Sequence, residues 1–465
     1  ALPTADDPRW QADPLADATV DSFLGRRLGD DAGADDRAEG WRRLAAAQRA
    51  LGQWTDNASL ATWQPEPGCP DEVGHALRRY LDEARALPPW ADATAIARAE
   101  ALFMRHGPLS CLLLFCASLP ECYVMPDLSA VLHEAGQLEA HTEHRIRQTA
   151  AMIFPVMLAG GLTDPRGAGV AQVLKVRLIH ATIRHLILRG DPQAVVARSA
   201  AIEPRVAASD GGPALALHRR LHAMGWPLAE RGLPCNQLEL GYTLLTFHYV
   251  YLRGLRTLGV PLDADDERAC LHAWNVMGHV LGLTGPGMAA SMPQAQEAFD
   301  ALRARAATQL PQPDPRPALA QALMAVMQAY LPWRWLHPLP VLMTRRLTGP
   351  ATARALALDG PQPWPARLLF GAGWALVQGL DRVARLFWPR FTLSGLVVHV
   401  VGVRMLGRLL MDQTRPLRLP EGLAPQVHAA LAHWRAHPGH DRAPARTGWA
   451  TRLARRWMAN PTRGS

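Results

Sequence analysis

The sequence predicts an all-α protein. No stretch of any length alternates apolar and polar residues as a half-buried strand does, whereas long segments rich in Ala, Leu and Arg carry apolar residues three and four positions apart. With 49% hydrophobic and 19% charged residues, the composition is that of a globular protein rather than of a disordered chain or a polytopic membrane protein. A chain of 465 residues can form two or three average domains or one large helical domain.

Apolar periodicity places the helices between clusters of turn-forming residues. The strongest punctuation is the run GGLTDPRG at 160–167, which separates two long helices. The proline-rich segments 311–317 and 359–363 are stiff connectors, and neither is long enough to require a domain boundary. The predicted helices are 41–52, 74–87, 92–106, 108–118, 127–160, 170–189, 214–225, 237–258, 264–282, 293–308, 316–330, 366–387, 393–412 and 425–435.

We therefore divide the chain into three parts. Residues 1–40, which are rich in aspartate, are expected to wrap the body as an N-terminal arm. Residues 41–415 form the helical domain, and residues 416–465 carry a last helix and an Arg-rich tail that is a candidate for disorder.

Charge and cysteine content exclude several classes of protein. The net charge is +8, but the basic residues are spread along the chain with acids between them, whereas nucleic-acid binding needs a basic patch, so no nucleic-acid partner is expected. The apolar runs are shorter than the roughly 20 residues that span a bilayer. The six cysteines form neither CxxC nor CxxCH, so a zinc ribbon and a covalently attached haem are not indicated, and Cys111, Cys116 and Cys122 are expected to be buried thiols.

The first candidate site is a polar stripe on a predicted helix. His141, Arg145, Gln148 and Thr149 fall at helical spacing on one face. Such a stripe usually faces solvent. Here the helix continues into the apolar run 150–158, so the stripe can also end inside the protein, as a site requires.

The second candidate site is a histidine between two arginines in an apolar helix. Arg177, His180 and Arg184 share one face among Leu, Ile and Val. Burying two arginines is costly unless anions meet them, and a haem would supply both an iron for the imidazole and propionates for the guanidiniums. The alternative is a core histidine that is hydrogen-bonded to a neighbouring helix. Other metal chemistry is not indicated, because the sequence has neither HExxH nor clustered carboxylates, and His248, His272, His279 and His399 lack partners at ligand spacing.

These segments together resemble the latex-clearing proteins and mycophenolic-acid-type oxygenases, a family of haem b proteins. Order and spacing hold from about residue 10 to 285, and more loosely to about 415. The specific segments are those of Arg145 and His180. The resembling stretches are 13–17, 132–138, 145–149, 175–184, 236–237, 243–247 and 274–282.

The resemblance implies a single helical domain with a globin-like core that encloses non-covalent haem b. His180 matches the proximal ligand of the iron and Arg184 an arginine beside the haem, while Arg177 is added from helical geometry alone. Arg145 and Thr149 match the distal pair of the family.

Gln148 stands where the rubber-cleaving members of the family have a lysine. A glutamine amide is a very poor iron ligand, so a lysine-capped closed state is not expected from this position, although Gln148 can still donate a hydrogen bond to dioxygen, as Arg145 can. His141 is a weaker candidate for a sixth ligand. Glu134 and Asp127 are the nearest acids to the position of a proposed base.

The function that the resemblance implies is oxidative cleavage of C=C bonds in an isoprenoid, ideally polyisoprene, to aldehyde and ketone ends. The partners would then be dioxygen and a hydrophobic substrate in an apolar channel, with the apolar residues of 152–158 as lining or as ordinary core. One alternative is a smaller terpenoid or unsaturated lipid reached from a membrane or polymer surface, since Trp364, Trp374 and Trp388 alternate with arginines. The other is a non-enzymatic protein that binds haem and dioxygen. A monomer is expected, secreted or periplasmic if the substrate is a polymer and cytoplasmic otherwise.

Overall fold

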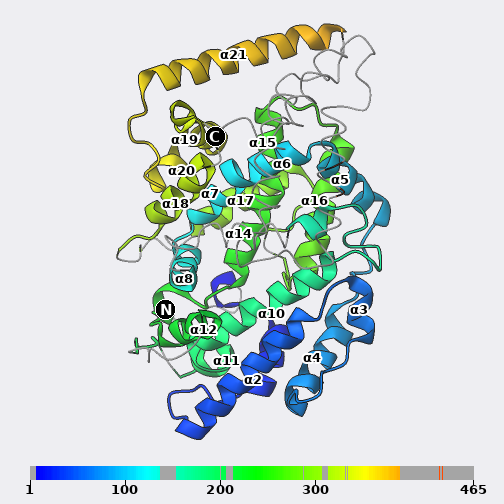
Figure 1. The fold of residues 1–465 in the computed structure, drawn as a ribbon, viewed down its shortest axis with the longest axis vertical. Coiled ribbons are helices and arrows are strands. Elements are labelled where there is room, and N and C mark those ends of the chain that lie inside the picture. Colours follow the sequence, from blue (N-terminus) through cyan, green and yellow to red (C-terminus); the bar gives the residue numbers. More distant parts are fainter. Residues whose placement is uncertain are drawn as a thin grey trace.

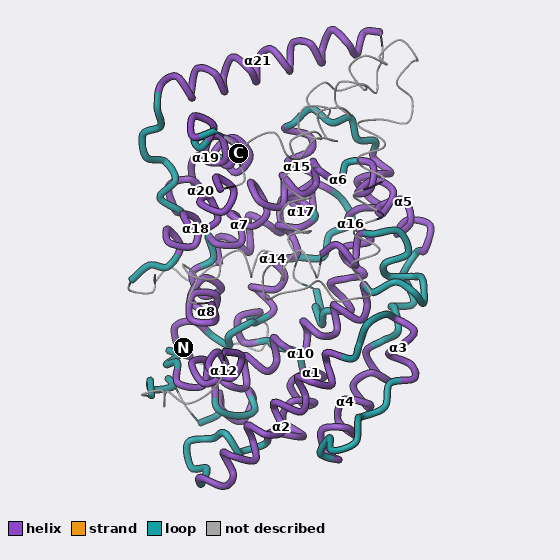
Figure 2. Tube along the Cα trace, in the orientation of Figure 1, coloured by secondary structure: helices purple, strands orange, loops and turns teal. Residues whose placement is uncertain are grey.

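A computed structural model confirms the all-α prediction. It describes residues 7–136, 153–198, 200–205, 213–285, 287–305, 313–329 and 333–387, together with residues 310, 331, 429 and 432. Within these ranges every regular element is a helix, apart from one isolated bridge between Ile202 and Trp226 (Figure 2). The predicted helices at 393–412 and 425–435, and the tail, lie outside the described residues.

The first described residues, 7–84, pack under a long central helix, α10 (Figure 1). The predicted arm contains η1, α1 and the first turns of α2. α1 lies against both α10 and α4. The elements are η1 (Pro8–Trp10), α1 (Pro14–Leu24), α2 (Ala34–Gly52), α3 (Asn57–Thr62), α4 (Asp71–Ala84), α5 (Ala93–Arg105), α6 (Gly107–Leu113), η2 (Leu114–Ser118), α7 (Leu119–Tyr123) and α8 (Pro126–Gly136).

The middle of the chain supplies α10 itself and the helices that cover it. α10 contacts α1, α12 and α16, and α16 packs along α5. The elements are α10 (Gly169–Leu188), α11 (Pro192–Val196), α12 (Pro213–Ala223), α13 (Leu228–Arg231), α14 (Gln237–Phe247), α15 (Tyr249–Thr257), α16 (Ala264–Val280) and α17 (Met292–Arg305).

The last described helices form the end of the molecule opposite α2 (Figure 1). They are α18 (Arg316–Ala329), η3 (Arg334–Leu336), α19 (Leu339–Thr348), α20 (Pro350–Ala355) and α21 (Trp364–Phe387). None of the described helices is long and apolar enough to cross a membrane alone; one bent pair, Ala93–Arg105 with Leu109–Tyr123, reaches that length and composition together.

Two predicted helices are interrupted. The segment 237–258 breaks at His248, whose buried ring lies 3.3 Å from the carbonyl oxygen of Gly287, so two helices, α14 and α15, replace one. The segment 108–118 ends in the π-helical turn η2 directly before Pro120. Because a proline cannot donate the next helical hydrogen bond and crowds the preceding turn, a local widening of the helix is the expected response.

Buried polar contacts connect the helices beside η2. The carboxylate of Glu121 in α7 is fully buried and accepts hydrogen bonds from Arg253 (3.0 Å), Arg303 (3.1 Å) and the Thr352 hydroxyl (3.0 Å). One acid thus ties α7 to α15, α17 and α20. Cys111, Cys116 and Cys122 are buried free thiols, as predicted.

Candidate functional site

The predicted turn at 160–167 fixes the start of α10. The Asn57 amide donates to the carbonyl oxygens of Gly161 (3.0 Å) and Asp164 (2.9 Å), and its oxygen accepts the amide of Ala171. Gly169 lies so close to Gly161 that an added Cβ would be 2.6 Å from the Gly161 carbonyl oxygen. Two glycines and one asparagine therefore set the point at which the central helix begins.

One face of α10 is apolar and only partly covered. Val176, Ile179, His180 and Ile183 follow one another at helical spacing, and none of them is fully buried. Ile179 is 46% exposed, although α10 runs through the middle of the molecule (Figure 1). His180 is thus the one polar member of an apolar stripe on a central helix.

The His180 ring is neutral at physiological pH and makes no hydrogen bond among the described residues. Burial lowers the pKa of His180 to about 4; the neighbouring Arg184 lowers it further and Asp13 acts in the opposite direction. Nδ1 is buried without a hydrogen-bond partner. The hydrogen-bonded core histidine that was the alternative is therefore not what the described contacts show.

These residues fit a haem. A porphyrin is a flat apolar ring with one metal at its centre, and a neutral imidazole in an apolar stripe presents the matching surface and ligand. The described residues contain no cluster of His, Cys, Asp or Glu that could hold a bare metal ion. His180 is accordingly the residue that would hold the iron.

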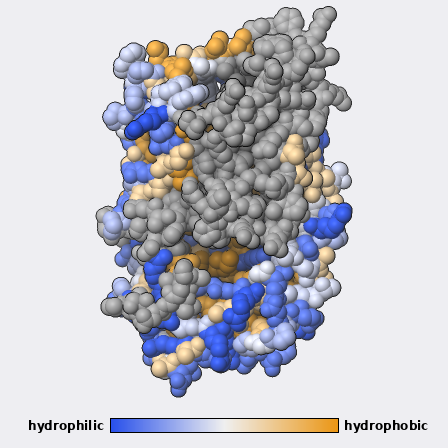
Figure 3. All heavy atoms as spheres, in the orientation of Figure 1, coloured by the Kyte–Doolittle hydropathy of each residue, from blue (hydrophilic) through white to orange (hydrophobic). Residues whose placement is uncertain are grey.

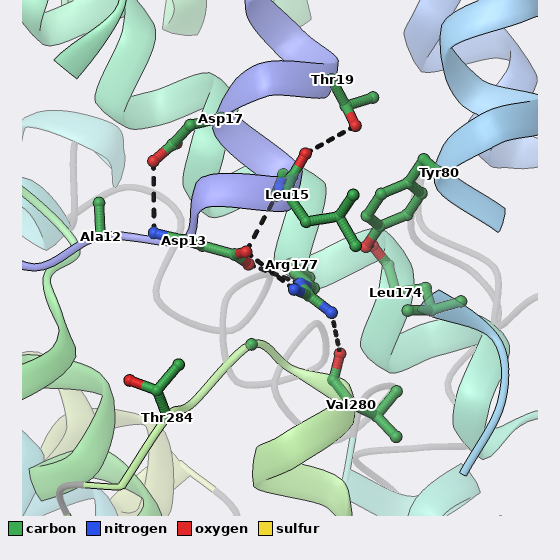
Figure 4. A network of polar contacts seen from close by, with 12 residues as sticks. Ala12, Asp13, Leu15, Asp17, Thr19, Tyr80, Leu174, Arg177, Val280 and Thr284 are labelled. Atoms are coloured by element: carbon green, nitrogen blue, oxygen red, sulfur yellow. Dashed lines mark hydrogen bonds and ion pairs between the residues drawn. The ribbon is translucent and has the colours of Figure 1, made fainter. Parts of the chain in front are cut away.

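Arg177 is held by the N-terminal helix. Its guanidinium donates to both carboxylate oxygens of Asp13 (2.5 and 2.8 Å) and to the carbonyl oxygen of Val280 (3.2 Å), and it lies over the ring of Tyr80 (Figure 4). Asp13 also caps α1 by accepting the amide of Ala16. The contact joins α1, α10 and α16 at one point.

Arg184 is held in the same way one turn beyond His180. It is fully buried, its Nη2 lies 2.7 Å from the Asp17 carboxylate, and it donates to the carbonyl oxygens of Pro234 and Cys235. Burial raises the pKa of Asp17, and the attraction of Arg184 opposes that rise. Asp13 and Asp17 thus clamp the arginines on either side of His180.

Two buried arginines need anions, and carboxylates of this chain supply them. The sequence reasoning missed Asp13 and Asp17 in that role, although their spacing of four residues on α1 was a signal, since it places both on one helix face. Contacts of Arg177 and Arg184 with haem propionates stay a prediction. Arg145, Gln148, Thr149 and His141 lie outside the described residues.

A small cavity is lined in part by Ile153 and Phe154, the first described residues after the segment of the predicted distal residues. Its volume is ≈ 20 Å³, and its lining is mainly apolar and aromatic. The hydroxyls of Ser110 and Tyr251, two of the lining residues, share a hydrogen bond of 2.9 Å. Ile153 and Phe154 line this cavity and belong, with Val156 and Met157, to the hydrophobic core. The lining residues are Phe103, Ser110, Cys111, Leu114, Ser118, Ile153, Phe154, Phe247, Tyr251 and Trp274.

Asp127 is the better described of the two candidate acids. It is buried near Arg231, and burial raises its pKa to about 6 while Arg231 and Arg9 oppose the rise. The side chain of Glu134 lies outside the described residues. A carboxyl group with this pKa can exchange a proton near neutral pH.

Buried neutral histidines make the stability of the fold depend on pH. Burial lowers the pKa of His248 to about 3. As pH falls below the unfolded value near 6.5, the unfolded state takes up a proton that the folded state refuses, so stability is lost between about pH 6.5 and 3. At pH 5 this one group costs about 2 kcal/mol.

Urea unfolding of wild type and His248→Gln at pH 7.5 and pH 5 checks this expectation. The variant should lose about 2 kcal/mol less than wild type between the two pH values, whatever its absolute stability. Equal losses would contradict a neutral buried His248.

Comparison with known proteins finds similarity to a family of oxygenases. Residues 214–386 match a family profile described as "ER-bound oxygenase mpaB/B'/Rubber oxygenase, catalytic domain". The curated rubber oxygenase of Streptomyces sp. (strain K30) is 24% identical over 244 residues, which are 52% of this chain and 49% of the relative. The chain thus aligns with about half the length of that relative.

A solved structure extends the comparison to nearly the whole fold. The latex clearing protein LCP in its closed state matches with a TM-score of 0.58 and 19% identity, covering 95% of each chain. The shared helical fold therefore includes α10, which the profile match at 214–386 does not reach.

Proposed function

The chain belongs to the family of latex-clearing proteins and rubber oxygenases, and from this premise we propose that it is a haem b-dependent dioxygenase that cleaves C=C bonds of an isoprenoid. Poly(cis-1,4-isoprene) is the proposed substrate, with aldehyde and ketone ends as products. One observation carries the proposal. His180 is neutral, makes no hydrogen bond with the described residues, and lies in an apolar stripe of α10 that is partly exposed.

Each part of the chain has a defined task in this proposal. His180 would hold the iron of the haem, which when bound supplies the redox chemistry with dioxygen. The apolar residues around His180 would pack against the porphyrin ring. Arg145, Gln148 and Thr149 are proposed to donate hydrogen bonds from the opposite side. An alkene offers no polar handle, so apolar walls such as those of the cavity at Ile153 and Phe154 must orient it.

A smaller substrate is the second candidate. This candidate is a short terpenoid or an unsaturated lipid taken from a membrane or polymer surface, and it is favoured by Trp364, Trp374 and Trp388, which alternate with arginines in the sequence. A protein that binds haem and dioxygen without turnover is the remaining alternative.

Two measurements on the purified protein test the proposal. Absorption spectra of the oxidised and reduced protein, with and without imidazole, should show a haem b spectrum that responds to added ligand. Dioxygen consumption and carbonyl products should then appear with latex. Full haem loading without consumption on latex, but with consumption on a short isoprenoid alkene, would favour the second candidate; no turnover on either would favour simple binding.

A bulky residue in the cavity should slow the reaction without removing haem. We expect Ile153→Trp to lower kcat/KM for the alkene by about tenfold or more, because the indole would fill the space at the lining and keep the substrate out. The Soret absorbance should stay unchanged. Ile153→Val, which removes one methylene, is the matched control and should retain activity. Equal rates in Ile153→Trp and wild type would place the substrate elsewhere.

A further inference from the structure

The outer face of α21 is apolar and exposed. Trp364 is 72% exposed, and Leu368 and Leu376 are each 63% exposed. These residues lie four or eight positions apart and therefore share one face, and Leu369 and Leu380 widen that face. In the space-filling view hydrophobic residues line the edge of the molecule along this helix (Figure 3).

The opposite face of α21 is the one that contacts the protein. Ala366 is buried, Trp374 packs with Phe370 and lies under the guanidinium of Arg346 at 5.2 Å, and Gln378 donates to the carbonyl oxygen of Leu258. α21 runs along the end of the molecule with its other side free of the described helices (Figure 1). The exposed apolar face thus takes no part in the contacts that hold α21 on the protein.

The described segment that contains this helix is rich in arginine. Residues 333–387 contain seven arginines and two acids, whereas residues 1–330 of the sequence contain 30 basic residues and 36 acids. Basic residues occur along the whole chain, but most acids precede residue 331. The net positive charge therefore belongs to the C-terminal part of the sequence. Arg334 and Arg367 are exposed. Arg334 stands in the sequence between Trp333 and Trp335, whose exposed rings stack with their centroids 5.8 Å apart.

A broad apolar face within a cationic region matches an anionic lipid surface. Tryptophan and leucine enter the boundary between headgroups and acyl chains, and each arginine near such a surface adds electrostatic attraction to anionic headgroups. A second copy of the chain would bring like charges together, and a nucleic acid offers nothing for the leucines. By itself the described α21 is not long and apolar enough to cross a membrane, so we place it in the plane of the interface.

We propose that α21, through Trp364, Leu368 and Leu376, docks the protein on bilayers that contain anionic lipid. The proposal stands on α21 and its charged surroundings and is independent of the cofactor and of the reaction.

Vesicle flotation with the full-length protein tests it. Wild type should float with phosphatidylcholine vesicles containing 30 mol% phosphatidylserine, float at least about tenfold less with phosphatidylcholine alone, and be released as salt is raised. Trp364→Ser/Leu368→Ser/Leu376→Ser should bind anionic vesicles at least about tenfold less with an unchanged far-UV spectrum. Trp90→Ser, which removes a 47% exposed tryptophan from the loop before α5, is the matched control and should float like wild type.

Other outcomes would overturn the proposal. Absence of flotation with anionic vesicles, or equal flotation of wild type and the triple variant, would show that α21 is not the docking element. A dimer in light scattering that the triple variant disperses would identify a second copy as the occupant. Binding to polyisoprene particles without binding to vesicles would identify the polymer.

Discussion

Replacement of His180 by alanine is expected to abolish the Soret absorbance of the protein as purified. The ring nitrogen that would ligate the iron is lost, and the rest of the stripe at Val176, Ile179 and Ile183 offers only apolar contacts. Loss of a second-shell partner alone lowers metal affinity by 10 to 100-fold, so loss of the ligand should lower haem occupancy by more than about tenfold.

Two further measurements separate loss of a ligand from loss of the fold. Added imidazole should restore a haem spectrum to His180→Ala by filling the space of the missing ring. His279→Ala, which removes an exposed histidine beside Trp90, should keep full haem content. A His180→Ala protein with unchanged haem content and spectrum would refute the assignment of the ligand and with it the proposed function.

Asp17→Ala should destabilise the fold by about 3–5 kcal/mol. Arg184 has no access to water, so removal of the carboxylate leaves a buried guanidinium without a counter-charge. Urea unfolding at pH 7.5 measures the loss. Asp265→Ala, which removes an exposed partner of Arg268, is the control and should cost less than about 1 kcal/mol.

A double variant isolates the effect of the unpaired charge. Asp17→Ala/Arg184→Met should recover part of the lost stability, because an apolar pair of similar volume replaces one uncompensated charge. Should Asp17→Ala cost no more than Asp265→Ala, the clamp would contribute little and α10 would be held by apolar packing alone.

Local patterns in the sequence were enough to predict the helices but not their interruptions. The turn at 160–167 and the apolar spacing after it predicted α10 to within a residue at each end. The breaks at His248 and at η2 were not predicted, because the apolar pattern runs through both and the causes are a distant contact with Gly287 and a proline whose effect depends on its neighbours.

Residue chemistry predicted that Arg177 and Arg184 need anions, because burying charge is costly. Both arginines meet carboxylates of this chain, whereas the prediction was that haem propionates supply the anions. Which anions they meet depends on how α1 folds back over α10, and no periodicity within either segment encodes that docking. Helical spacing is enough to predict the apolar face to which His180 belongs. It does not predict that neighbouring helices leave part of this face exposed.

The clamp between α1 and α10 has a consequence for the order of events during synthesis. Asp13 and Arg177 are 164 positions apart, and Asp17 and Arg184 are 167 apart. At translation rates of about 5–20 residues per second, the carboxylates leave the ribosome roughly 10–30 seconds before the guanidiniums that they will meet. Closing so long a loop carries an entropic cost that only the later contacts repay. The contact of α1 with α10 is therefore completed only after residue 184 has been synthesised, which makes it one of the later steps in the assembly of the N-terminal half.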